Sequence, residues 1–128
     1  MENEITFVTS DNITFNVNSN VKNILKNINS ESNNLVLQDI SSEILTYLLE
    51  YCYYHNFTNP PKIQRSSSKN DLRQCLQDEG DFNFIIKVGN YEKVSYLLLA
   101  ATSLGCEGLE DLCYTYLGFF FRCICLIT

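Results

Sequence analysis

The sequence has little positive charge, no long apolar run and no leader-like start. Its 9 lysine and arginine residues are outnumbered by 15 aspartate and glutamate residues, which gives a net charge of −6. Because a nucleic-acid-binding protein needs a basic surface to meet phosphates, we expect no nucleic-acid partner. No uncharged apolar run reaches the ~20 residues that span a bilayer, and no segment has the pattern of a signal peptide. We therefore expect no membrane association and a cytoplasmic or nuclear location.

Histidine is scarce, and the cysteines lack metal-binding spacing. His55 is the single histidine, and no two cysteines are separated as in C-x-x-C. Since a zinc site needs several convergent ligands, the sequence predicts no metal centre and no cofactor. Without a secretory signal, the cysteines are expected to be reduced and mostly packed as small hydrophobic side chains. They are Cys52, Cys75, Cys106, Cys113, Cys123 and Cys125.

No group of residues predicts catalysis. His55 has no acid or nucleophile close to it in the sequence and is interpreted as a surface or loop histidine. Cys113 lies on an apolar helical face, where a buried and inert thiol is expected. No glycine-rich phosphate loop is present. The acidic run from Asp78 to Asp81 is interpreted as a solvated turn rather than a cation site. The sequence therefore predicts that the protein is not an enzyme.

The first part of the chain has the periodicity of a small sheet. With 128 residues, 45% of them hydrophobic, the chain fits one domain with a modest core. Alternating apolar residues from Ile5 to Val17, interrupted by turn residues at 10–12, predict a β-hairpin. A short asparagine-rich helix is expected between Val21 and Ile28. The apolar run at residues 35–37 predicts a third strand.

A helix with two apolar stripes is predicted within the segment from Leu37 to His55. Ser41 is the expected N-cap, because its hydroxyl can accept from an unpaired amide of the first turn. One stripe has the spacing of a core face: Ile44, Leu45, Leu48, Leu49 and Cys52. The second is turned by roughly 120° from it: Tyr47, Tyr51 and Tyr54. The tyrosine stripe is either the margin of the core or a surface for a partner.

The second half of the chain is predicted to begin with a loop and to end in helices. Residues 57–80 carry prolines and serines without periodicity and predict a long surface loop. Two helices follow, one capped by Gly105 and the other ending at Gly118. Residues 119–128, which are apolar apart from Arg122 and Thr128, form a separate tail with no helical stripe. This tail could fold back on the domain, pair with a second copy or aggregate, and we favour the first two.

Several segments resemble the S-phase kinase-associated protein family, the adaptor of SCF ubiquitin ligases. They are ITFVTSDNITFNV, LQDISSEILTYLLEYCYYHNFTNPP, DFNFIIKV and YLLLAATSLGCEGLEDLC, in the order of that family. Together they cover about residues 4 to 117. The resemblance implies a BTB/POZ-like α/β (α+β) fold, similar to that of elongin C. It has a small three-stranded sheet covered by helices, and the resemblance implies that residues 1–118 form this domain, with a truncated C-terminal helical extension.

The resemblance also implies a function and two contact surfaces. Family members are non-catalytic adaptors that link a cullin to an F-box-type substrate receptor for ubiquitin-dependent degradation. The residues implied to face the cullin are Asp39, Ile40, Tyr47, Tyr51, Thr102 and Ser103. The residues implied to begin the F-box groove are Leu109, Leu112, Cys113, Tyr116 and Leu117.

The sequence departs from the family pattern in three places. The segment from Val17 to Leu25 is shorter than the family's helix there. Thr102 and Ser103 stand where the family has Asn-Tyr on its cullin-facing surface, which predicts weaker cullin binding. Few residues follow Gly118, where the family has several helices around the F-box, so the groove is expected to be incomplete. The alternatives are a BTB-type homo-oligomerisation module, with a homodimer as one form, or a truncated non-functional family member.

Overall fold

The sheet lies at one end of the molecule. The computed structural model describes residues 4–28, 34–61, 63, 76 and 78–127, and their side chains as far as Gly118. Strands β1 (Glu4–Val8) and β2 (Thr14–Asn18) pair antiparallel with Phe7 opposite Phe15, and β3 (Asn34–Val36) pairs parallel with β1. The order is β2-β1-β3. The predicted hairpin and third strand are confirmed.

The predicted short helix is a 3-10 turn rather than an α-helix. The segment η1 (Ser19–Asn23) begins after Asn18, whose side chain accepts from the amide of Asn20. The apolar residues that follow are nevertheless buried, as their spacing predicts: Val21, Ile24 and Leu25. Asparagine side chains compete with helical hydrogen bonds, which is consistent with a helix this short.

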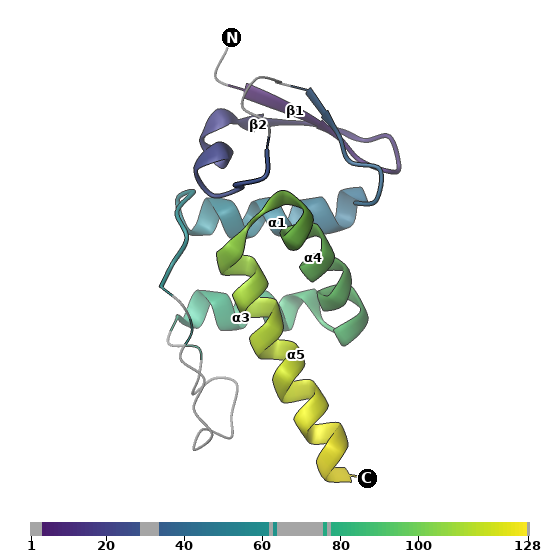
Figure 1. Cartoon of the computed structure of the whole chain (residues 1–128), viewed down its shortest axis with the longest axis vertical. Helices are drawn as coiled ribbons and strands as arrows, with labels where there is room; N and C mark the ends of the chain where they lie inside the picture. The colour runs from purple at the N-terminus through teal and green to yellow at the C-terminus, as the bar shows by residue number, and fades with distance from the viewer. Residues whose placement is uncertain (1–3, 29–33, 62, 64–75, 77, 128) are drawn as a thin grey trace.

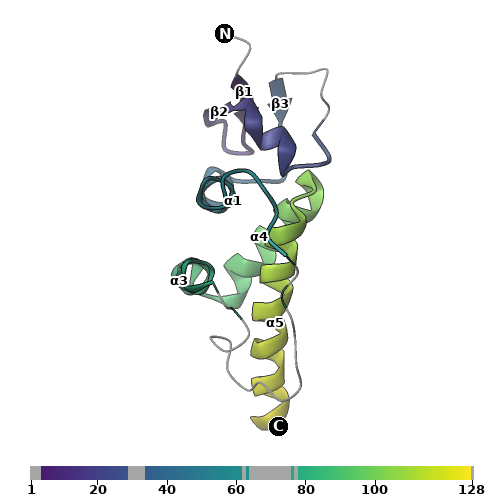
Figure 2. The ribbon, with the colours of Figure 1, turned by 90° about the vertical axis from the view of Figure 1, so that its left-hand side faces the viewer.

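Helix α1 (Ser42–Tyr54) is the central layer of the molecule. Ser41 caps it, with the hydroxyl accepting from the amide of Ile44 at 3.3 Å, as predicted. All five residues of the leucine stripe are buried. Figures 1 and 2 show α1 between the sheet on one side and α3 (Glu79–Val88) on the other. The core is therefore built on both sides of α1.

The acidic run that was interpreted as a solvated turn is the start of α3. Asp78 is the N-cap, with its carboxylate accepting from the amide of Asp81 at 3.1 Å. Asp81 is buried. The interpretation as a solvated turn is therefore wrong, and the predicted loop ends before residue 79. Of that loop, residues 62, 64–75 and 77 lie outside the described residues.

Two helices complete the domain. Helix α4 (Tyr91–Leu104) ends at Gly105, whose φ of 80° is the left-handed conformation that glycine adopts readily. Helix α5 (Glu107–Ile127) does not end at Gly118, so that prediction is wrong. Its continuous backbone carries the chain away from the sheet, as both views show, and does not fold back at Gly118 (Figures 1 and 2).

Three of the six cysteines have described side chains, and all three are free and buried: Cys52, Cys106 and Cys113. This confirms the predicted packing for them. The other three side chains lie outside the described part of the chain. Among the described residues, no helix combines the length and apolar character that a membrane crossing requires.

Candidate partner-binding surfaces

The tyrosine stripe of α1 is divided between the core and the surface. Tyr51 is only 2% exposed, and its ring lies 5.9 Å from that of Phe84 on α3. Tyr47 is half-buried and meets Phe84 edge-on, whereas Tyr54 is exposed. The prediction that Tyr51 faces a cullin is wrong, because packing of α3 against α1 covers it.

The segment before α1 contributes one exposed and one buried residue. The side chain of Ile40 is buried in the core, and its carbonyl accepts from the amide of Ser10 at 2.8 Å. Ile40 is therefore not a surface contact, contrary to the prediction. Asp39 is exposed and lines a hollow of about 350 Å³ between the start of α1 and α4. We call this the α1–α4 hollow; it is lined by Ser10, Asp39, Ser41, Glu43, Ile44, Glu92, Lys93 and Tyr96.

The outward side of α4 carries two large apolar side chains that the sequence analysis missed. Tyr96 is 56% exposed and Leu99 is 65% exposed. Both lie on the same helical face as Ser103, at i, i+3 and i+7. Thr102 and Ser103 are exposed, as a contact role requires, while their carbonyls accept from the side-chain amide of Asn27 at 3.2 and 3.3 Å. We call Tyr96, Leu99 and Ser103 the α4 outer face.

The predicted start of the F-box groove is part of the core. Helix α5 packs against α3 and α4, which bury one of its faces. Four of the five predicted residues are buried: Leu109, Leu112, Cys113 and Leu117. Tyr116 is half-buried, and its hydroxyl donates to the carbonyl of Gly89 at 3.5 Å. The prediction is wrong for the buried four, since the chain's own helices cover the face that was expected to be open.

Comparisons with known proteins give the family. The model of the Skp1 family, tetramerisation domain, matches residues 3–57, which contain the sheet and α1. The S-phase kinase-associated protein 1 homolog of Tetrahymena thermophila is 32% identical over 112 residues, or 88% of this chain. The chain is Skp1-like. The fold of this Skp1-like chain is the predicted α+β, BTB/POZ-like arrangement. The chain spans 64% of the length of that curated relative.

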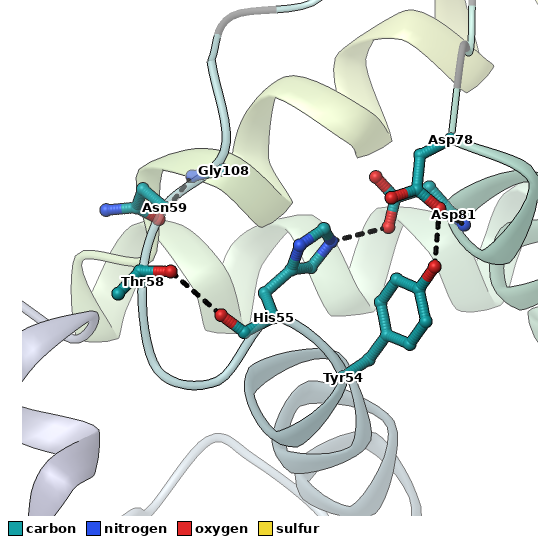
Figure 3. Close-up of polar contacts among 7 residues, drawn as sticks. All are labelled: Tyr54, His55, Thr58, Asn59, Asp78, Asp81 and Gly108. Atoms are coloured by element: carbon teal, nitrogen blue, oxygen red, sulfur yellow. Dashed lines mark hydrogen bonds and ion pairs between the residues drawn. The ribbon is translucent and has the colours of Figure 1, made fainter.

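A polar cluster in this Skp1-like chain joins the end of α1 to the start of α3 (Figure 3). His55 Nε2 lies 2.7 Å from Asp81 Oδ1, and the two side chains are only 10% and 9% exposed. Next to them, the hydroxyl of Tyr54 donates to Asp78 Oδ1 at 2.7 Å. His55 lies in the turn that follows α1, as expected of a loop histidine, but its side chain is largely buried against an acid rather than exposed on the surface. The acid lies 26 residues further along the chain, so only the folded structure brings the pair together.

Burial and hydrogen bonding have opposite effects on the pKa of Asp78. Partial burial raises the pKa of this carboxyl group, but hydrogen bonds from Tyr54 and from the amides of Asp81 and Gly80 outweigh it and leave the pKa lowered. The same contact with Asp78 raises the pKa of the Tyr54 hydroxyl. The hydrogen bond between the two residues therefore favours the carboxylate form of Asp78 and the neutral form of the Tyr54 hydroxyl.

Proposed function

We propose that this chain is a non-catalytic adaptor subunit of a cullin-RING ubiquitin ligase of the SCF type. In this role it would link a cullin to an F-box-type substrate receptor. Similarity to the Skp1 family supports an adaptor role over a homo-oligomerisation module. The observation that carries the cullin contact is the α4 outer face, where two large apolar side chains stand exposed beside the family's cullin-facing position.

Tyr96 and Leu99 are suited to act as anchors for the cullin. Full burial of a leucine side chain stabilises by about 1.5–3 kcal/mol, and tyrosine is common among the residues that dominate binding energy. Thr102 and Ser103 offer much less apolar area than the family's Asn-Tyr. We therefore infer that binding energy has moved along α4 from residues 102 and 103 to Tyr96 and Leu99.

The charge of the α1–α4 hollow defines the partner surface further. Asp39, Glu43 and Glu92 line it together with one cation, Lys93, which pairs with Glu43 at 3.0 Å. A partner that presents lysine or arginine at this edge would complement the excess negative charge. Such rim contacts are screened by salt, so the association rate with the cullin is expected to fall as ionic strength rises.

The test is titration of the purified chain with the N-terminal domain of a cullin. Tyr96→Ala and Leu99→Ala should each weaken binding about tenfold or more, which corresponds to about 1.4 kcal/mol. The matched control is Tyr114→Ala, because Tyr114 is 55% exposed but lies on α5, outside both the α4 outer face and the α1–α4 hollow. Equal affinity for all three variants and the parent chain would refute the assignment of this surface.

The receptor side of the proposal is tested separately with an F-box peptide. An adaptor binds the peptide and the cullin domain together, which a size-exclusion experiment detects as a ternary complex. A chain that only self-associates, with neither partner bound, would contradict the adaptor role and support the oligomerisation module instead.

A further inference from the structure

Three side chains with metal-binding atoms converge between α1 and α3. His55 immediately follows α1, Asp78 caps α3, and Asp81 lies in the first turn of α3. One ligand atom from each residue lies within 4.8 Å of the other two. Figure 3 shows the imidazole and both carboxylates directed toward one another across the gap between the two helices.

The donor set suits a divalent transition-metal ion. It consists of one imidazole nitrogen and two carboxylate oxygens, which are ligands of Zn²⁺ and similar ions. Zinc holds such atoms at about 2.0–2.2 Å, so neighbouring ligands stand roughly 3.3 Å apart in a tetrahedral site. The 2.7 Å contact between His55 and Asp81 would have to open slightly, and Asp78 would have to move inward. Side-chain rotation is sufficient for displacements of this size.

Surrounding residues hold the two carboxylates in place, as is common for the ligands of a metal ion. Asp78 is held by the hydroxyl of Tyr54 and by the amide of Asp81. The side chain of Asp81 is 91% buried, and among the described residues its carboxylate has one hydrogen-bond partner, His55 Nε2. Burial removes most of the water that would solvate this carboxylate, and a bound cation would compensate for that loss.

The net negative charge of the cluster also favours a bound cation. Two carboxylates face one imidazole here, and no lysine or arginine pairs with either carboxylate within the described residues. With a neutral imidazole the cluster carries two negative charges, one of them on the buried side chain of Asp81. A divalent cation would neutralise them, whereas a single proton on His55 neutralises only one.

We propose that His55, Asp78 and Asp81 bind a divalent transition-metal ion, represented by Zn²⁺, which ties the end of α1 to the start of α3. The remaining coordination positions would be filled by water, as in other zinc sites with three protein ligands. The His55–Asp81 hydrogen bond holds the same two elements together when no ion is bound. The inference is independent of the adaptor function, since it rests only on these three side chains and their surroundings.

The decisive variant is Asp78→Asn, because it leaves the local structure in place. Asparagine caps helices as well as aspartate does, and its oxygen can still accept from Tyr54. It removes one charged ligand, so Zn²⁺ affinity measured by calorimetry should fall at least tenfold. His55→Gln should lower it by a similar factor or more. The matched control is Glu92→Gln, which alters an acid in the first turn of α4 and should leave the affinity unchanged.

A second measurement separates this site from the cysteines. Co²⁺ replaces Zn²⁺ in such sites and reports its ligands by absorption, since thiolate ligands give an intense charge-transfer band that nitrogen and oxygen ligands do not. The full-length chain under reducing conditions should bind Co²⁺ without that band. Binding with a thiolate band, equal Zn²⁺ affinity in Asp78→Asn and the parent chain, or no saturable binding would each overturn the proposal.

Discussion

Replacing Tyr51 with phenylalanine should stabilise the protein. The hydroxyl oxygen of Tyr51 is inaccessible to solvent and has no hydrogen-bond partner among the described residues. Burial raises the pKa of this hydroxyl far above its ordinary value, so it stays neutral. A buried polar group without a partner costs about 1–3 kcal/mol, and phenylalanine keeps the ring contacts with Phe84 and His55. Allowing for a small void, we expect a gain of about 1 kcal/mol in unfolding free energy.

Gly108 packs against the Tyr51 hydroxyl, so a substitution at Gly108 tests the same contact from the other side. A Cβ atom at this position would lie 2.5 Å from the Tyr51 hydroxyl and 2.8 Å from Pro60 Cδ. In an open helix, Gly→Ala stabilises by about 1 kcal/mol, but overpacking costs about 1–3 kcal/mol. Gly108→Ala should therefore destabilise the parent chain. The loss should be smaller in the Tyr51→Phe background, since the closest contact is gone.

Thermal and urea unfolding of the parent chain, the two single variants and the double variant measures both effects as a double-mutant cycle. For a chain of this length, 1 kcal/mol corresponds to a Tm shift of about 4 °C. Tyr51→Phe should raise Tm by about that amount without changing the urea m value. A lower Tm for Tyr51→Phe would show that the hydroxyl makes a stabilising hydrogen bond, and strict additivity with Gly108→Ala would show that the two groups do not touch.

Three further predictions concern the core, the cullin contact and acid stability. Leu48→Asp should prevent folding because it buries an unpaired charge, whereas Tyr47→Ala should only lower Tm; similar losses in thermal melts would contradict the division of α1 into two faces. Restoring the family's residues with Thr102→Asn and Ser103→Tyr should tighten cullin binding in a titration, and unchanged affinity would place that contact elsewhere. Hydrogen bonds from Ser42 and Thr9 lower the pKa of Asp11 from 3.8 to about 2, so Asp11 should stabilise the fold above pH 4 and lose this effect as pH falls toward 2. Asp11→Ala should flatten that part of the pH profile, and an unchanged profile would refute its role.

The sequence determined the features that depend on neighbouring residues. Strand and helix periodicities are fixed by the backbone. The alternating residues of the hairpin and the leucine stripe of α1 therefore predict which side chains face the core. The caps at Ser41 and Gly105 follow from local chemistry, since a serine oxygen accepts from amides of its own helix and glycine tolerates positive φ. Comparing segments in order also revealed the family, because each motif is short and local.

The tertiary structure decided what depends on distant contacts. Periodicity placed Tyr51 on a stripe that could have been either surface or core, and only Phe84 on α3 covers it. The groove residues of α5 were predicted to be open because the sequence does not state that the chain's own α3 and α4 pack on them. His55 and Asp81 are 26 residues apart, and their contact exists only because α3 lies beside the end of α1. A helical face has the same apolar pattern whether its own domain or a partner covers it, so the sequence alone could not identify the binding surface.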